Sequence, residues 1–252
     1  MCYNIAVKKI ILFIAIFFIT IIPGYSALVH SSWFKTAPAS SVRAQKLVEK
    51  VEQQFSRIRD ARADFTLDTN LYLFGCVGFN RLNGVLYYKA PDLIKCTLNK
   101  DTWLFKGNFI RKTDAQGKAT YYRLINAPDL SVGFTPRLIY HNFNLKVIRE
   151  SSREVAIEAL PKPGVLKNVI KVIFYIDPAE SLLRGMDMVF ENKSIHGKAD
   201  IKYGKIGDIW IPISTAGESA FESKAGYLIG FSFSLKGKDF HINTGLTDND
   251  FK

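Results

Sequence analysis

Apolar and polar residues alternate along most of this chain, and this alternation limits its possible folds more than any other feature. In one stretch Phe231, Phe233 and Leu235 alternate with Ser232 and Ser234. Successive side chains of a β-strand point to opposite faces of the sheet, so this pattern gives one apolar and one polar face. Similar stretches recur at short intervals with little helix between them. The chain is therefore expected to be mainly β.

The predicted strands follow one another closely enough to form one long sheet. About ten strands are expected, and a sheet of that length should be mostly antiparallel and should curl. No linker divides residues 40–252, and no internal repeat is present. We therefore expect a single domain over this range.

One helix is indicated ahead of the strands. It should begin at Ser40 or Ser41, either of which can cap its N-terminus. A second short helix or a flap is expected over residues 127–144, where prolines interrupt the strand pattern. The first helix should lie inside the curve of the sheet, because its apolar residues recur at three- and four-residue spacing. This stripe consists of Ala44, Leu47, Val48, Val51, Phe55 and Ile58.

Turn signals divide the predicted strands. The pair Asn83-Gly84 is typical of a reversal, so one strand should run from Ala63 to the Arg81–Gly84 turn and a second over Gly84–Lys89. Asp114–Gly117 predicts another reversal. The other strands are expected at Leu93–Leu98, Asp101–Arg111, Thr120–Ile125, Leu145–Arg149, Glu154–Leu160, Val169–Ile176, Leu182–Glu191, Lys198–Lys205, Ile209–Ser214, Tyr227–Leu235 and Asp239–Asn243.

The N-terminus has the parts of an export signal. Lys8 and Lys9 precede an apolar run over Ile10–Ile22, and Pro23-Gly24 ends that run before small residues. Cleavage after Ser26 or Ala27 would leave residues 28–39 as a linker. An uncleaved membrane anchor is the alternative, although the run is shorter than the ~20 apolar residues that span a bilayer. We expect a periplasmic protein.

Export changes how the charge is interpreted. Residues 1–27 contain two Lys and no acid, so their removal lowers the net charge from +11 to +9. Anionic lipid head groups or envelope polymers are then more plausible partners than nucleic acid. Solubility from dispersed Lys residues is the alternative, because the positive charges form no block.

Cys76 and Cys96 are the cysteines that remain after such cleavage. We expect them on the first and third strands of a meander, where the strand between them keeps them about 9–10 Å apart. That separation exceeds the reach of a disulfide. Two free, buried thiols are therefore expected, unless strong twist or non-sequential pairing brings them together.

The sequence carries no pattern typical of catalysis or of a metal centre. Its four histidines, His30, His141, His196 and His241, are isolated and show no ligand spacing. There is no G-x-S-x-G motif, Walker loop or zinc-type cysteine pattern. We expect no enzymatic activity, no metal and no cofactor.

The apolar face of the sheet is the candidate binding surface. A single helix, ~10 Å wide, cannot cover about ten strands spaced ~4.8 Å apart, so part of this face should remain as a hollow. Aromatic residues make up 13% of the chain, and rings and methionines suit an adaptable apolar pocket. The residues expected to line it are Phe65, Leu67, Leu86, Tyr88, Ile94, Trp103, Phe105, Val172, Phe174, Met186, Met188, Phe231 and Phe233.

Short motifs in order along the chain resemble those of the LolA-type outer-membrane lipoprotein carriers and the wider LolA/LolB-like superfamily. The first is Ala63-Asp64-Phe65-Thr66 after the helix, with Leu67 where Gln is usual. The third, the closing run Ile242–Phe251, ends in a D-x-x-F motif. The second motif lies between these two and matches the family at Gly84, Leu86, Tyr87, Lys89, Pro91, Leu93 and Lys95.

The resemblance implies an open, incomplete β-barrel with helices over an apolar hollow that takes lipoprotein acyl chains. It also implies a monomeric periplasmic carrier between an inner-membrane release complex and an outer-membrane acceptor. The Arg that helps hold the lid closed in typical carriers is Ala90 here, and Ile94 and Cys96 replace the usual Phe and Trp. The alternative is a membrane-anchored or soluble envelope protein of the same fold. Such a protein would bind another lipid or a protein partner without shuttling.

Overall fold

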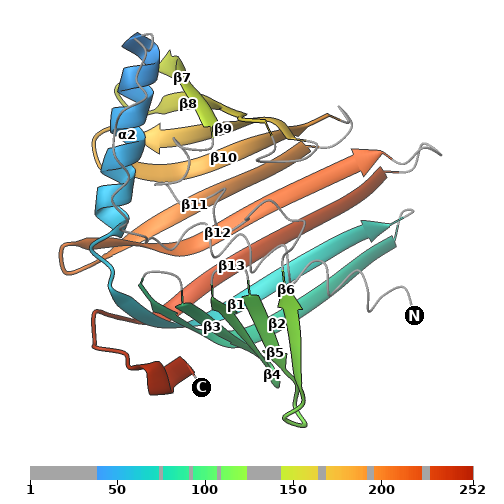
Figure 1. Cartoon of the computed structure of the whole chain (residues 1–252). Helices are drawn as coiled ribbons and strands as arrows, with labels where there is room; N and C mark the ends of the chain where they lie inside the picture. Colours follow the sequence, from blue (N-terminus) through green and yellow to red (C-terminus); the bar gives the residue numbers. More distant parts are fainter. Residues whose placement is uncertain are drawn as a thin grey trace.

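A computed structural model describes residues 39–73, 76–90, 93–106, 109–123, 143–163, 169–191, 196–222 and 228–251. Within these ranges the chain forms one sheet with a helix against it (Figure 1). The elements are α2 (Ala39–Phe55), β1 (Asp60–Leu73), β2 (Cys76–Lys89), β3 (Leu93–Leu98), β4 (Asp101–Lys106), β5 (Phe109–Thr113), β6 (Ala119–Arg123), β7 (Phe143–Glu150), β8 (Val155–Pro161), β9 (Val169–Asp177), β10 (Leu182–Phe190), β11 (His196–Ile206), β12 (Ile209–Glu222), β13 (Leu228–Ile242) and the short 3-10 helix η1 (Asp248–Phe251).

The sheet has 13 strands in the order β6-β5-β4-β3-β2-β1-β13-β12-β11-β10-β9-β8-β7. All pairings are antiparallel, and neighbours in space are neighbours in sequence except at the centre, where β1 pairs with β13. The sheet thus consists of two meanders joined by the first and last strands. β6 and β7 are its edges, so the sheet is curved and open, as the sequence predicted.

Strand length sets the shape of the sheet. The central strands are long, with 14 residues in β1, β2 and β12 and 15 in β13. The strands near the β6 edge have only 5 or 6 residues. In Figure 1 these short strands turn away from the plane of the central strands, and α2 stands against the sheet at one side. The two faces are therefore distinct: an inner face that carries α2, and an outer face opposite.

The predicted apolar stripe anchors α2 on the inner face. Ala44, Leu47, Val48, Val51 and Phe55 are all buried, and α2 packs against β7, β10 and β12. The helix begins at residue 39 and ends at Phe55, so the last residue of the predicted stripe, Ile58, is buried in the segment that leads into β1. The exposed side of the helix carries Arg43, which forms an ion pair with Glu150 of β7.

The predicted reversal at Asn83-Gly84 is wrong, because both residues lie inside β2, opposite Thr66 and Phe65 of β1. Glycine is needed there for close packing. A Cβ at Gly84 would lie 2.2 Å from the carbonyl oxygen of Thr97 and 2.6 Å from the Phe65 ring. The Asn-Gly pair therefore makes room for a ring in a continuous strand.

Other strand boundaries also differ from the prediction. The segment predicted as one strand over Asp101–Arg111 forms two strands, β4 and β5, while the last two predicted strands merge into β13. β12 extends eight residues beyond its predicted end at Ser214, to Glu222. The reversal at Asp114–Gly117 is confirmed: Gly117 has φ +80°, and the Asp114 carboxylate accepts hydrogen bonds from two backbone N–H groups. The predicted flap over residues 127–144 lies almost wholly outside the described residues, as do residues 1–38.

The cysteines are separated in a way that the prediction did not anticipate. Cys76 opens β2 opposite Leu73, whereas Cys96 on the next strand faces Leu86 of β2. Ten residues of β2 separate the two levels, or roughly 33 Å along an extended strand. Cys96 has a free thiol. Distance along the strands, and not an intervening strand, keeps the two cysteines apart.

Candidate functional site

The inner face brings together all thirteen residues predicted to line the hollow. The register aligns them from strand to strand. Leu86 lies opposite Cys96, and Met186 lies opposite Phe174. Because the side-chain period of a strand is two, this alignment places the whole set on one face.

The thirteen residues divide between two apolar clusters. The first lies under and beside α2, and the second lies toward the β6 edge. Leu86 packs against both clusters, so the apolar face is continuous between them. The first cluster contains Phe65, Leu67, Val172, Phe174, Met186, Met188 and Phe233, with Phe231 packed against it, and the second contains Tyr88, Ile94, Trp103 and Phe105.

Small residues on β11 and β12 let the largest side chains of the first cluster lie flat on the sheet. A Cβ at Gly217 would lie 2.6 Å from the nearest Phe233 ring atom, so this ring rests on bare backbone. Gly197 on β11 lies beneath Met188, although a Cβ there would make only an ordinary 3.5 Å contact with its nearest carbon. The Phe231 and Phe233 rings stack with centroids 6.0 Å apart. The result is a smooth apolar surface.

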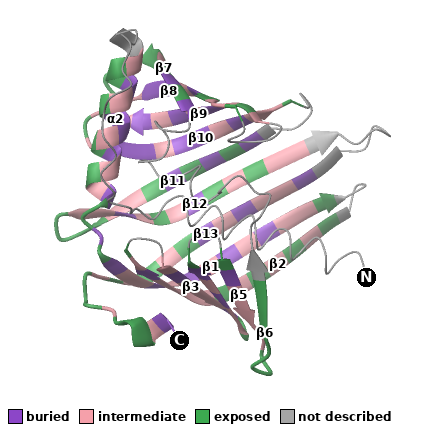
Figure 2. Cartoon of the chain, viewed as in Figure 1, coloured by how far each residue is buried: buried purple, intermediate pink, exposed green. Residues whose placement is uncertain are grey.

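Along β1 and β13, burial on the inner face decreases toward the strand ends that carry Leu71 and Phe231. Leu235 and Phe233 of β13 are buried, whereas Phe231, farther along the strand, is half-buried. On β1, Leu67 is buried and Leu71 is half-buried. Figure 2 shows buried residues gathered where α2 stands against β7–β10, and more half-buried and exposed residues along the central strands. The inner face is therefore partly accessible at Leu71 and Phe231, whereas the second cluster is buried.

The polar groups of the inner face are few and are held in place. The Tyr203 hydroxyl donates to the carbonyl of Leu183 at 2.9 Å, and burial raises the pKa of Tyr203. Burial also raises the pKa of the Cys96 thiol to about 12, so this thiol is protonated at neutral pH. Near the β6 edge, Lys112 pairs with Asp101 and lies over the Trp103 ring. None of these arrangements activates a nucleophile.

Three residues that carry the resemblance serve a structural purpose on the outer face. The Tyr87 ring packs edge-on against Phe251 of η1, with centroids 6.4 Å apart. Lys95 donates to the backbone carbonyl of Asp250 at 2.8 Å, and Lys89 pairs with Asp248 at 2.6 Å. The second motif therefore binds the closing D-x-x-F run, which fixes the C-terminus to β2 and β3.

The buried carboxylate of Asp60 holds the same C-terminal run from its other end. It accepts hydrogen bonds from the backbone N–H groups of Thr244 and Gly245. Asn243, at φ 55°, joins the segment before β1 by accepting from Arg59 N–H and donating to the Arg57 carbonyl. The sequence did not assign this anchor, although an acidic residue three positions before the first motif was a possible signal.

Sequence reasoning also missed inner-face residues that complete the surface. Ile201 and Tyr203 continue the alternation of Ala199 on β11, whereas Leu235, recognised in the sequence on the apolar face of its strand, was left out of the predicted lining. The glycines that admit the rings were missed because glycine has no side chain to register in an apolar pattern. The available signal in the sequence was that small residues recur at every second position beside these glycines.

The described residues contain no group of three or more His, Cys, Asp or Glu side chains that could hold a metal ion. Over the same ranges, no helix has the length and apolar character needed to cross a membrane. His241, one of the isolated histidines, is exposed on β13.

Solved structures share this architecture. A DUF1329 family protein from Desulfovibrio piger aligns over 84% of this chain and 97% of its own, with a TM-score of 0.64 and 13% identity. A putative outer membrane lipoprotein-sorting protein domain from Vibrio parahaemolyticus aligns over 83% and 97%, with a TM-score of 0.57 and 14% identity. A LolA superfamily protein from Nitrosomonas europaea aligns over 83% of this chain and 97% of its own, with a TM-score of 0.54 and 12% identity.

The chain has a LolA-like fold. No family model matches its sequence, and no curated protein does. At 12–14% identity the likeness concerns the fold alone. Within this LolA-like fold, the curved open sheet and its inner apolar face are the features that bear on function.

Proposed function

We propose that the chain is a periplasmic carrier that binds lipoprotein acyl chains on its inner face and moves lipoproteins from the inner toward the outer membrane. The observation that carries this proposal is the continuous apolar face that α2 covers only in part. The helix has 17 residues and is about 26 Å long, whereas 13 strands extend over roughly 58 Å. Within the described residues, α2 is the α-helix that packs on this face.

The chemistry of this face suits an acyl chain. Its lining is mainly apolar and aromatic, and the hydroxyl of Tyr203 already donates to the Leu183 carbonyl. Each CH₂ group transferred from water gains about 0.8 kcal/mol, so a chain of ~16 carbons gains on the order of 12 kcal/mol before the cost of ordering it. The flat rings and flexible methionines can adapt to chains of different length.

The likeness to the Vibrio parahaemolyticus protein domain, a putative outer membrane lipoprotein-sorting domain, supports this proposal. An acyl chain is bound in a carrier only while it is shielded from water, and an open hollow permits both loading and release. The proposal assigns the chain no catalytic role and no cofactor.

One observation favours a second candidate, a protein of the same fold that binds a lipid or a partner without shuttling. The lid Arg of typical carriers is replaced by Ala90, which is exposed and whose backbone N–H donates to the Arg59 carbonyl at 2.7 Å. Cleavage of the N-terminus separates the two candidates, since a freely diffusing carrier needs it and a static anchor does not. Mass spectrometry of the protein from bacterial envelopes measures this directly.

The test of acyl-chain binding is to express the full chain in a bacterium, purify it from the periplasm and identify bound lipids and lipoproteins by mass spectrometry. Phe231→Glu puts a charge on the accessible inner face and should abolish lipid co-purification. Ala216→Glu puts the same charge on an exposed outer position of β12 and should leave it unchanged. Equal lipid content in the two variants, or no lipid in the parent protein, would rule out binding on this face.

A further inference from the structure

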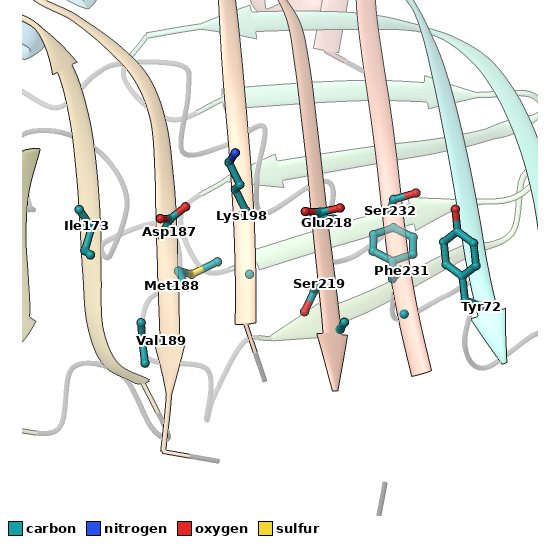
Figure 3. A pocket seen from close by; sticks show the side chains of 13 residues that line it. Tyr72, Ile173, Asp187, Met188, Val189, Lys198, Glu218, Ser219, Phe231 and Ser232 are labelled. Atoms are coloured by element: carbon teal, nitrogen blue, oxygen red, sulfur yellow. The ribbon is translucent and has the colours of Figure 1, made fainter. Parts of the chain in front are cut away.

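The outer face of the sheet carries a groove that the proposed function does not use. Its volume is about 660 Å³, within the range of ligand-sized clefts. It crosses β9 to β13 and ends at β1, as Figure 3 shows. Met188 and Phe231 point inward. Most other lining residues are the strand neighbours of such inward-facing residues, so their side chains point to the face opposite α2.

One edge of the groove is a polar row. Asp187 on β10, Lys198 on β11, Glu218 on β12 and Ser232 on β13 lie directly opposite one another in register. Figure 3 shows these four side chains in line across the strands. Ile173 on β9 closes the row at one end.

The other edge is an apolar row. Val189, Ala220, Gly230 and Tyr72 lie at one level on β10, β12, β13 and β1, and His196 is the residue at this level on β11. The Tyr72 ring leans over Gly230, where an added Cβ would lie 3.3 Å from the ring. From β10 to β1 this row extends over four strand spacings, or about 19 Å.

Apolar side chains continue the groove past Tyr72. Val77 lies opposite Tyr72, and Phe79 lies two residues farther along β2. Tyr72, Val77 and Phe79 are 42%, 63% and 58% exposed. Exposed apolar residues that are contiguous on a sheet mark an interaction surface, and tyrosine is enriched at the energetic centres of such surfaces.

The charges of the groove favour a cationic occupant. Lys198 already forms an ion pair with Asp200 at 3.6 Å, and no described residue forms an ion pair with Asp187 or Glu218. One oxygen of Asp187 accepts from the Tyr175 hydroxyl at 2.6 Å, but the other is buried with no hydrogen-bond donor in the described structure. The chain as a whole has a net charge of +11, so the acidic side chains of Asp187 and Glu218 set this groove apart from the positive balance of the protein.

We propose that this groove docks a segment of a partner protein that presents apolar side chains together with Lys or Arg. The apolar residues of the segment pack along the row from Val189 to Tyr72, and its cations meet Asp187 and Glu218. A mainly apolar row about 19 Å long, beside a polar row that holds two carboxylates, fits an extended amphipathic segment better than a compact ligand. The groove lies on the face opposite the proposed acyl-chain site, so docking leaves that site free.

The probe is a fluorescein-labelled peptide of alternating Leu and Lys, with a Leu-Glu peptide of the same length as its counterpart. Fluorescence anisotropy with the full chain should give at least tenfold tighter binding of the Lys peptide. Glu218→Lys reverses a charge at an exposed position and should weaken that binding at least tenfold. Glu49→Lys makes the same charge change on α2 and should weaken it less than twofold.

A second variant tests the apolar row without changing charge. Ala220→Trp fills the groove and should weaken binding of the Lys peptide, while circular dichroism confirms that the fold is retained. Equal peptide binding by Glu218→Lys and Glu49→Lys, or equal binding of the two peptides, would overturn the docking proposal. Lipid co-purification with Glu218→Lys should match the parent protein, so a failure of acyl-chain binding is recognised separately.

Discussion

Gly217 on β12 lies directly beneath the ring of Phe233 on β13, close enough that a Cβ at residue 217 would lie 2.6 Å from the ring. The two residues are opposite each other in register, on the inner face. This contact shows how the sheet keeps a large ring flat against its surface. The inner face is therefore smooth because certain positions lack a side chain.

Gly217→Ala should destabilise the protein by about 1–3 kcal/mol, since the added methyl group overpacks the Phe233 ring and would lie 2.8 Å from the Lys198 carbonyl oxygen. Urea unfolding measures this change. Gly197→Ala on the neighbouring strand is the matched control, because its Cβ would meet Met188 at an ordinary 3.5 Å and should change stability little. Equal losses in the two variants would contradict the role assigned to the Phe233 ring.

Gly84→Ala should destabilise the sheet by roughly 2 kcal/mol or more, because the new Cβ would meet both the Thr97 carbonyl and the Phe65 ring. Asn83→Ala should cost only about 0.5–1.5 kcal/mol, as it removes one hydrogen bond with Thr66. Thermal unfolding of both variants provides the comparison. A larger loss of stability in Asn83→Ala than in Gly84→Ala would contradict the placement of both residues inside β2 and would favour a turn there.

Phe251→Ala should release the C-terminal run from the outer face, with a loss of about 2–4 kcal/mol in unfolding free energy. Phe251 is buried against Tyr87, and its removal leaves a gap on β2 and β3. Hydrogen exchange at the amides of Tyr87 and Lys95 should increase. Asp248→Ala removes the ion pair with Lys89, in which the aspartate is 85% exposed, and should have a smaller effect than Phe251→Ala on both measurements.

Cys96 should react slowly with iodoacetamide in the folded protein. Burial raises the pKa of its thiol to about 12, and the thiolate is the reactive form. In a variant whose only cysteine is Cys96, the rate should rise about tenfold per pH unit well beyond pH 9, because the folded-state pKa lies above that range. In urea the rate should level off near the ordinary thiol pKa. A plateau near pH 9 in the folded protein would show that the thiol is not buried.

Tyr175 should titrate later than an ordinary tyrosine. Burial, together with the hydrogen bond to Asp187, raises the pKa of Tyr175 to about 12. A raised folded-state pKa gives stability that is present below the unfolded value of about 10 and is lost as pH rises toward 12. Asp187→Asn removes the charge that disfavours the phenolate and should lower this pKa. The absorbance change at 295 nm, with Tyr175→Phe subtracted, measures it.

The mainly β class and the helix could be expected from local pattern, because alternation and helical spacing are properties of short segments, whereas the LolA-like fold was expected from the resemblance of the motifs. The stripe from Ala44 to Phe55 determined which side of α2 is buried, and the period of two along β13 determined which side chains face inward. All thirteen predicted lining residues share the inner face for the same reason. Side-chain parity survives errors in strand boundaries, provided that no bulge intervenes.

Strand boundaries needed the tertiary structure. Asn83-Gly84 is a turn signal in isolation, yet it lies within β2 because pairing with β1 continues through it and the Phe65 ring occupies the space above Gly84. The split of Asp101–Arg111 into β4 and β5 likewise depends on cross-strand pairing. Long-range hydrogen bonds outweigh local propensity in these segments.

The sequence by itself determined the class of the fold, the side of α2 that is buried and the apolar character of one sheet face, since each depends on residues close together in the chain. Only the tertiary structure decided that β1 pairs with β13, that Tyr87 and Lys95 bind the C-terminal run and that Asp187, Lys198 and Glu218 share one row. These relationships join residues far apart in the chain, and their register is set by the packing of the whole sheet.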